Sequence, residues 1–389
     1  MTEIRVLSDE AQFRTHTAVF RRAMHMPIPN DEQWQVVLPS YEPDRVLAAF
    51  DGDEMIGTTQ SYGSSLVVPG GAVVPHAAIS RVGVRADYTR RGVLTALMRE
   101  QLETLPDPVA TLRASEGRIY GRFGYGLAGR WRSVEIDAKR AVVAGEMVGR
   151  VRMIDADTAD KLLPELHEAI GLTRPGQIGR WTGWWARERD RKSHAENSVT
   201  VVHSGPHGDD GFLTYKVTEE KEFKHRMSIE DMVWANDDAW RDLWIYASRL
   251  DLVDQIEADI ALDAPVSWLF EDPRVVHTKD VFDEIWLRLV DVERMLQART
   301  YGASEPVVIE VRDRLLPANN GSYRVSPGGA ERVDAPADFA IPVDLLGAVY
   351  FGDTTFSQLA ATKRITGSRF GQADALFAVP QKPLCGTFF

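Results

Sequence analysis

A chain of 389 residues is too long for one ordinary hydrophobic core, so its length predicts two or three domains. Its 44% hydrophobic and 26% charged residues are typical of a folded globular protein and argue against extensive disorder. The formal net charge of −12 disfavours a nucleic acid partner, which needs a basic surface; it would attract cationic small molecules, or it serves solubility alone.

The cysteines and histidines of the chain show no metal-binding pattern. The single cysteine, Cys385, excludes an internal disulfide and a thiolate cluster. Only His203 and His207 have ligand-like spacing, and they lie in a polar turn, so we expect no metal. The N-terminus lacks the pattern of a signal peptide, and no stretch approaches the roughly 20 apolar residues of a membrane helix. We therefore expect a cytosolic protein without a membrane partner.

The first region, residues 1–145, predicts an α+β order of elements. Apolar periodicity, caps and turn residues place them as follows. The expected elements are a strand at 4–6, a helix at 9–24, a hairpin of strands at 46–50 and 55–62, edge segments at 66–68 and 72–74, a strand at 79–84, a helix at 92–105, a strand at 109–114, a glycine-rich helix or turn at 115–126 and a strand at 131–136.

The turn between the strand at 79–84 and the helix at 92–105 is a candidate phosphate site. A helix N-terminus offers unpaired N–H groups and a positive dipole end, and Arg90 and Arg91 beside Gly92 add charged donors. The spacing fits neither a P-loop nor a Rossmann turn. It resembles the acetyl-CoA grip of the GNAT superfamily of N-acetyltransferases, in which a V-x-V strand leads into R/Q-x-x-G-x-G/A. Thr89 and Leu94 depart from the first and last motif positions, which would weaken coenzyme affinity.

The second region, residues 146–284, repeats the element order of the first. We expect a helix at 155–170, strands at 197–203, 211–217 and 226–234, a helix at 237–249 and a strand at 252–258. The later helix begins with Asn236, Asp237 and Asp238, and an acidic helix start repels a pyrophosphate. This degenerate copy is therefore expected to bind no coenzyme. Trp181, Trp184 and Trp185 are interpreted as core residues or as an oligomer contact.

The third region, residues 285–389, combines helices with a small sheet. Residues 284–300 open it, strands follow at 306–312, 321–326 and 337–342, and helices at 343–350 and 355–365 precede the tail. This part looks like the sterol-carrier-type domain that ends some bacterial acetyltransferases. The fold expected for the whole chain is two tandem GNAT-like domains, the second degenerate, followed by a sterol-carrier-like domain.

Acetyl transfer from a thioester needs a proton acceptor for the amine, support for the oxyanion and a proton donor for the thiolate. The backbone of Val82, Gly83 and Val84 can hydrogen-bond the pantetheine arm and the acetyl carbonyl, with Gly83 permitting close approach. A tyrosine phenol is a suitable acid for a thiolate. Tyr120 and Tyr125 follow the next strand, and each is either such an acid or an amphipathic core residue.

Two strings make the resemblance more specific. RVGVRADYTRRGVL and ASEGRIYGRFGYG, with the degenerate second copy and the aromatic C-terminus, resemble the enhanced intracellular survival (Eis) family of bacterial N-acetyltransferases over essentially the whole chain. The resemblance implies that Tyr120 is the general acid, that the terminal carboxylate of Phe389 is the base and that Trp34 walls the acceptor site. It also implies the acetyl-CoA contacts, which are Val82, Gly83, Val84, Arg90, Arg91, Gly92, Val93, Leu94, Thr95, Ser115 and Glu116.

The function expected from this resemblance is acetylation of a small multi-amine cation, such as an aminoglycoside, by direct attack on acetyl-CoA. The resemblance also implies a homohexamer. Two alternatives stay open: an acetyltransferase acting on a protein lysine or peptide amine, and a non-catalytic lipid-binding or regulatory protein. For residues 388–389 taken alone, an apolar tail docked on a core is the simpler interpretation.

Overall fold

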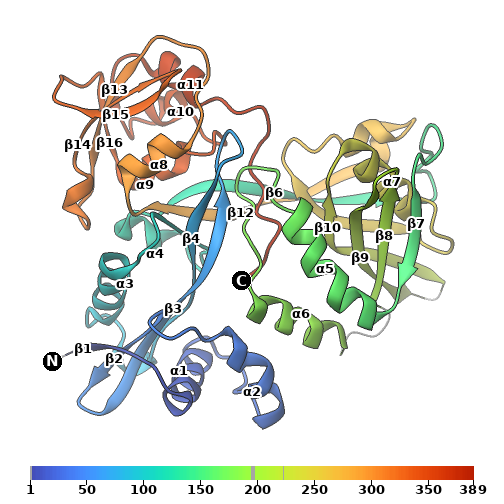
Figure 1. Ribbon diagram of the computed structural model, residues 1–389, viewed down its shortest axis with the longest axis horizontal. Helices are drawn as coiled ribbons and strands as arrows, with labels where there is room; N and C mark the ends of the chain where they lie inside the picture. Colours follow the sequence, from blue (N-terminus) through green and yellow to red (C-terminus); the bar gives the residue numbers. More distant parts are fainter. Residues whose placement is uncertain (1, 194–197, 222) are drawn as a thin grey trace.

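The computed structural model describes residues 2–193, 198–221 and 223–389. Within these ranges the strands form one sheet of 12 strands and one of five (Figure 1). Along the larger sheet the strands follow the order β1-β2-β3-β4-β5-β12-β6-β11-β10-β9-β8-β7, and the smaller sheet has the order β15-β14-β13-β16-β17. None of the described helices is long and apolar enough to span a bilayer.

The first unit contains five strands and four α-helices. These are β1 (Glu3–Val6), α1 (Glu10–Ala23), α2 (Asp31–Val37), β2 (Val46–Asp51), β3 (Glu54–Val67), β4 (Val73–Val84), α3 (Val93–Thr104), β5 (Val109–Leu112) and α4 (Gly117–Tyr120). The predicted helix at 9–24 corresponds to α1, which starts after Asp9, whose side chain accepts the Gln12 N–H at 2.9 Å. The helix α2 was not predicted; it begins with a capping box of Asn30 and Gln33.

The second unit repeats this arrangement, with two helices before its central strands and one after them. Its elements are β7 (Arg150–Ile154), α5 (Ala156–Ile170), α6 (Thr182–Ser193), β8 (Ser198–Gly205), β9 (Gly208–Lys221), β10 (Lys224–Trp234), α7 (Asp237–Ser248) and β11 (Gln255–Ala261). The strand predicted at 197–203 corresponds to β8, and its first residue lies outside the described residues. In both units, an antiparallel series ends in a parallel pair, β4 with β5 and β10 with β11.

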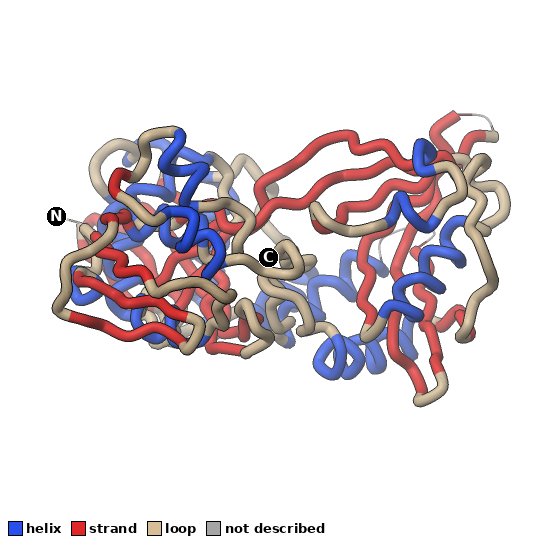
Figure 2. Tube along the Cα trace, turned by 90° about the horizontal axis from the view of Figure 1, so that it is seen from above, coloured by secondary structure: helices blue, strands red, loops and turns tan. Residues whose placement is uncertain are grey.

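The third unit packs short helices around the smaller sheet. Its elements are α8 (Val292–Ala298), β13 (Val307–Arg312), β14 (Gly321–Ser326), β15 (Gly329–Val333), β16 (Phe339–Pro342), α9 (Val343–Val349), α10 (Phe356–Ala361), β17 (Thr366–Gly367) and α11 (Phe370–Phe377). The short strand β15 and the helix α11 were not predicted. The tail, residues 378–389, follows α11 and ends near the middle of the molecule (Figures 1 and 2).

Two long strands fuse the first and second units into one sheet. β6 (Gly126–Asp137) pairs with β11, and β12 (Val276–Leu289) pairs with β6 through residues 276–287 and with β5 through residues 286–289. The expected domain boundary between residues 284 and 285 therefore falls inside β12. The first half of β12 is largely solvent-exposed and lacks an apolar run, so it has no clear strand signal in the sequence.

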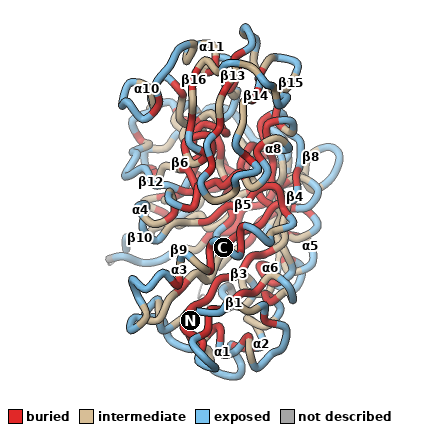
Figure 3. The backbone as a smooth tube through the Cα atoms, turned by 90° about the vertical axis from the view of Figure 1, so that its left-hand side faces the viewer, coloured by how far each residue is buried: buried red, intermediate tan, exposed pale blue. Residues whose placement is uncertain are grey.

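The third unit rests on this junction. Ile285 and Leu287 of β12 share one buried cluster with Leu346 and Val349 of α9, and Figure 3 shows buried backbone continuing through the centre of the molecule. Burying each such side chain contributes about 1.5–3 kcal/mol. Packing therefore fixes where the third unit sits and where its tail leaves.

Candidate active site

A cavity of about 580 Å³ opens where β4 and β5 separate. The two parallel strands pair at Ala77–Ala110 and Ala78–Thr111. Beyond these pairs the cavity is lined by residues 79–82 of β4 and by residues 112–115, which begin at the last residue of β5. An extra residue in β4, opposite the step from Thr58 to Gln60, forms a bulge in which Arg81 has a positive φ of 52°. Arg81, in this bulge, is one of the residues that line the cavity.

The helix α3 starts at the open end of β4, as predicted. Its N-cap, Gly92, has φ 85° and no side-chain cap, and Arg90 also has a positive φ of 61°. Successive N–H groups in such a turn make an anion-binding concavity at the positive end of the helix dipole. The predicted donors Arg90, Arg91 and Thr95 are exposed beside it, so this helix start suits a pyrophosphate.

The other predicted coenzyme contacts differ in burial: some line the cavity, one is exposed and others are packed in the core. Val82 and Ser115 line the cavity, whereas Glu116 is exposed next to it. The Val93 side chain is buried and can offer only its backbone, and Leu94 packs on the core beside Tyr120. Gly83 and Val84 precede the α3 turn. A Cβ at Gly83 would lie 3.1 Å from Ala23 of α1, so the missing side chain makes room for α1 rather than for a ligand.

Tyr120 ends α4 and lines the cavity with its ring 94% buried. Burial raises the pKa of its phenol above the ordinary value, the hydrogen bond with Ser115 opposes this, and the Glu116 carboxylate adds to the rise. The phenol is therefore kept protonated and can serve as a proton donor. Tyr125 is fully buried behind it, in edge contact with the Tyr120 ring, and is not among the residues that line the cavity.

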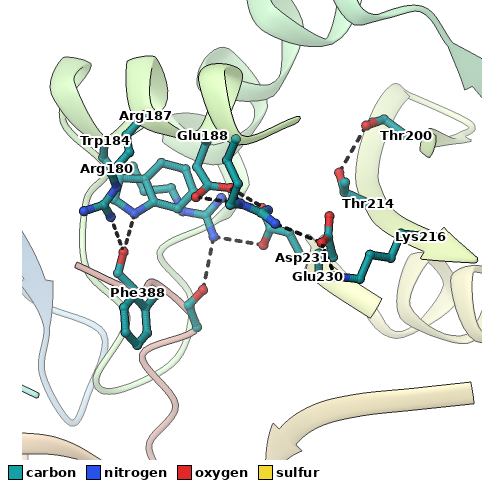
Figure 4. Close-up of polar contacts among 12 residues, drawn as sticks. Arg180, Trp184, Arg187, Glu188, Thr200, Thr214, Lys216, Glu230, Asp231 and Phe388 are labelled. Atoms are coloured by element: carbon teal, nitrogen blue, oxygen red, sulfur yellow. Dashed lines mark hydrogen bonds and ion pairs between the residues drawn. The ribbon is translucent and has the colours of Figure 1, made fainter. Parts of the chain in front are cut away.

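Phe389 lines the same cavity as Tyr120, although the two residues come from different units. The carbonyl oxygen of Phe388 accepts two hydrogen bonds of 2.8 Å, from Trp184 Nε1 and Arg187 Nη2 of α6 (Figure 4). The Phe389 ring packs edge-on against Trp181, which stacks on Tyr62. The cluster interpreted as core or oligomer contact thus holds the end of the chain.

Three charged residues that the sequence analysis did not single out hold the rest of the tail. Glu284 of β12 accepts the N–H groups of Cys385 and Gly386 at 3.0 and 2.9 Å. Arg113 donates to the Thr387 carbonyl at 3.2 Å and to Glu284. Arg180 is paired with Asp231 through two bonds and also donates to the Thr387 hydroxyl at 3.1 Å (Figure 4).

Trp34 has a different place from the one expected. It is 98% buried between α1 and α2, and its indole N–H donates to Glu10 at 2.7 Å. Its α2 neighbours Val36 and Val37 line the cavity, but Trp34 is not among the described lining residues. The indole therefore holds α2 against α1. Its large ring stabilises a small buried cluster, and its buried N–H is paired with Glu10.

The second unit has a comparable gap between β10 and β11, which pair only at residues 226–228 and 255–257. The helix that follows, α7, is capped by its own Asn236, whose side chain accepts the Ala239 N–H at 2.9 Å, and Asp237 and Asp238 occupy its first turn. That helix start is chemically unlike that of α3. Among the described residues, no group of three or more His, Cys, Asp or Glu side chains could hold a metal ion.

Comparison with known proteins agrees with this architecture. Residues 3–128 and 176–289 each match an acetyltransferase (GNAT) domain, and residues 292–386 match a sterol carrier protein domain. An uncharacterized N-acetyltransferase of Streptomyces griseus is 34% identical over 376 residues, 89% of either chain. The N-acetyltransferase Eis of Mycobacterium tuberculosis is 29% identical over 355 residues, 85% of either chain.

Solved structures give the same result at the level of the fold. The crystal structure of Eis1 from Mycobacterium abscessus is 36% identical, covers all of both chains and superposes with a TM-score of 0.93. A GCN5-related N-acetyltransferase from Anabaena variabilis, 19% identical, shares the fold over both full chains with a TM-score of 0.86. Two tandem GNAT domains and a sterol-carrier-like domain are thereby confirmed, and the chain belongs to the Eis-like N-acetyltransferases of the GNAT superfamily.

Proposed function

We propose that the protein transfers an acetyl group from acetyl-CoA to a primary amine, with Tyr120 as general acid and the terminal carboxylate of Phe389 as general base. The observation that carries this proposal is that both residues line one cavity, at the separation of β4 and β5. The tail that brings Phe389 there is hydrogen-bonded from α6, β12 and the end of β5. A chain end fixed in this way can hold its terminal carboxylate at one place in the cavity.

The residues around α3 fit acetyl-CoA. The uncapped helix start, with Arg90, Arg91 and the backbone of residues 92–95, would hold the pyrophosphate. The segment from Val82 to Val84 would follow the pantetheine arm, and Ser115 and Glu116 would lie on the opposite side of the gap. Acetyl-CoA supplies the activated acetyl thioester.

The reacting amine must be neutral when its nitrogen bonds to the acetyl carbon and the carbon–sulfur bond breaks. The carboxylate of Phe389, with an ordinary pKa near 3.5, is ionised at neutral pH and would take the proton that the amine loses. Tyr120 would give its proton to the departing sulfur. The bonds from Trp184 and Arg187 to the Phe388 carbonyl would hold the base in place.

Three readouts separate the acceptor classes that the resemblance leaves open. Release of CoA with kanamycin or a polyamine would support a multi-amine cation, and release with lysine peptides alone would support a protein or peptide acceptor. No release with any amine, alongside saturable lipid binding, would favour a lipid-binding protein. One cavity of the third unit, beside α10 and α11, has a volume of about 160 Å³, below the usual 300–1,000 Å³ of ligand pockets.

The acid and base are tested by Tyr120→Phe and by a chain with one glycine added after Phe389. We expect each change to lower kcat by about 10²- to 10⁴-fold, the usual contribution of general acid or base catalysis. Tyr125→Phe is the matched control, because that phenol is buried away from the cavity and should leave kcat within a few-fold of the wild-type value. Wild-type rates in both test variants would refute the assigned acid and base.

We also propose that the chain forms a homohexamer, which rests on the family resemblance. Light scattering coupled to size exclusion should give six times the chain mass of 43.5 kDa. A monomer mass at micromolar concentration would contradict this assembly.

A further inference from the structure

Three arginines from three different elements line the active cavity. Arg21 comes from α1, Arg81 from the bulge of β4 and Arg187 from α6, and all three line the cavity with Tyr120 and Phe389. Burial lowers the pKa of Arg21, and the positive charges of Arg81 and Arg187 lower it further. The Arg21 guanidinium is therefore close enough to the other two to be repelled by them.

The described acidic side chains form no ion pair with these arginines. Within the described residues, none of the three arginines has an Asp or Glu oxygen within 4.0 Å. Arg81 packs over the Tyr41 ring at 4.5 Å and donates to Thr17 at 3.4 Å, and Arg187 donates to the Phe388 carbonyl. Two negative charges line the same cavity, the terminal carboxylate of Phe389 and the side chain of Asp283, which also accepts the Trp286 indole N–H at 2.6 Å; one of the three positive charges is left over.

Acetyl-CoA does not account for the cluster. Its phosphates would bind at the start of α3, whose residues Arg90 and Arg91 are not among those that line the cavity, whereas Arg21 and Arg187 line it from α1 and α6. Apolar side chains also line the cavity, among them Phe20, Met24, Val37 and Phe282. A second ammonium group of a polycation would face repulsion here, and an anion would gain charge-assisted hydrogen bonds.

We infer that the acceptor amine carries a carboxylate on an apolar body, and that Arg21, Arg81 and Arg187 bind this carboxylate while the amine reaches Tyr120 and Phe389. The inference rests on the proposed acetyl transfer and names its acceptor class. A compact amino acid derivative with an apolar spacer fits both the volume and the charge of the cavity. A multi-amine cation fits the charge poorly.

The test compares acceptors that differ only in charge. With the full-length protein and acetyl-CoA, kcat/KM for 4-(aminomethyl)benzoate should exceed that for 4-(aminomethyl)benzamide by at least about tenfold, because hydrogen bonds to charged groups are the stronger ones. Equal values, or a preference for the amide or for spermidine, would overturn the inference.

Arginine variants assign the effect to the cluster. Arg21→Gln should reduce the benzoate-to-benzamide ratio at least several-fold through the acceptor KM, and Arg21→Lys should retain most of it. Arg22→Gln is the matched control, because Arg22 is the next residue of α1 and is exposed. A ratio unchanged in Arg21→Gln and in Arg81→Gln would also overturn the inference.

Two further measurements keep the inference separate from the chemistry and from the acyl donor. If no amine is acetylated, calorimetry still decides: selective binding of the benzoate supports the carboxylate site while the proposed function fails, and equal binding overturns the site. If the arginines instead bind the acyl group, succinyl-CoA should be preferred over acetyl-CoA and the acceptor ratio should be close to one, which again overturns the inference.

Discussion

A single backbone carbonyl, that of Phe388, receives two of the hydrogen bonds that fix the chain end. Trp184 donates from a ring that is 95% buried, and Arg187 donates from the next turn of α6. Arg180 stacks on the Trp184 ring, 4.2 Å from its centroid, while it holds residues 386 and 387. Each of these side chains thus helps to hold the tail.

Trp184→Phe should lower kcat by about 2- to 10-fold with little change in the acetyl-CoA KM. The change keeps an aromatic ring and removes one neutral hydrogen bond, which contributes about 0.5–1.5 kcal/mol. Steady-state kinetics beside Trp185→Phe provides the control, since Trp185 packs on His167 and on the Trp184 ring but is not one of the two donors to the Phe388 carbonyl. An equal loss in both variants would mean that general packing, not the bond to Phe388, is responsible.

The pH dependence of the reaction should have no falling limb from Tyr120 below about pH 10. Its folded pKa is raised by burial, so the phenol stays protonated below that pH and its contribution to stability is lost only as pH rises through the folded pKa. A profile of kcat/KM from pH 6 to 10 should rise as the amine loses its proton and then level off. A decline that begins near pH 8 and is absent in Tyr120→Phe would contradict this.

Residues that lie in short sequence motifs could be predicted, whereas residues that reach the site only through tertiary contacts could not. Tyr120 and the α3 turn lie in short motifs, so their neighbourhood could be predicted. Arg180 and Glu284 are ordinary charged residues far from the tail along the chain, and only folding places them there. Trp34, expected from the resemblance to wall the acceptor site, is packed in a small core, and this burial could not be read from its place in the sequence.

At the scale of single elements, the start of α3 is shaped by its backbone more than by its side chains. Gly92 has φ 85°, and the space around a Cβ there is open, so its role is conformational. Arg90 and Gly92 both have a positive φ. Such a backbone directs successive N–H groups toward one point, where an anion can bind. The glycine could be predicted from the motif, whereas the positive φ of Arg90 could not.

Gly92→Ala should raise the KM for acetyl-CoA several-fold and lower the free energy of unfolding by about 1–2 kcal/mol, the usual cost of a left-handed residue with a Cβ. Gly71→Ala is a close control, because Gly71 has φ 86°, equally open surroundings and a place in the β3–β4 turn. The control should lose similar stability at unchanged KM. A raised KM in both variants would remove the link to the α3 turn.

The element that sequence patterning failed to predict is the one that joins the units. β12 has an exposed first half and a buried second half, so no single periodicity runs through it. Its strand conformation comes from pairing with β6 and β5 on its two sides. Local propensity contains no information about such long-range partners.

On the scale of the whole molecule, the cavity is assembled from all three units. The first unit provides Tyr120 and residues 79–82 of β4, the second provides Arg187 of α6, and the third sends its tail between them (Figures 1 and 4). The order of the domains could be predicted from composition and motifs. Their fusion into a 12-stranded sheet, and the path of the tail, depend on tertiary contacts that the sequence does not display.

Glu284 is where these units meet most directly, and its substitution tests whether the assembly holds the chain end. Its fully buried carboxylate binds Arg113 of the first unit and two N–H groups of the tail. Glu284→Gln keeps the shape but leaves Arg113 without its counter-charge, so we expect a loss of about 3–5 kcal/mol in the free energy of unfolding.

The same substitution should free the tail well below the unfolding temperature. Carboxypeptidase should remove Phe389 and Phe388 from Glu284→Gln much faster than from the wild-type protein, as followed by mass spectrometry, and acetyl transfer should fall in parallel. Glu271→Gln, an exposed substitution in the second unit, should change none of these measurements. A variant that loses stability but keeps its tail protected would show that the buried carboxylate supports the sheet alone, and the fixed chain end would then depend on Trp184, Arg187 and Arg180.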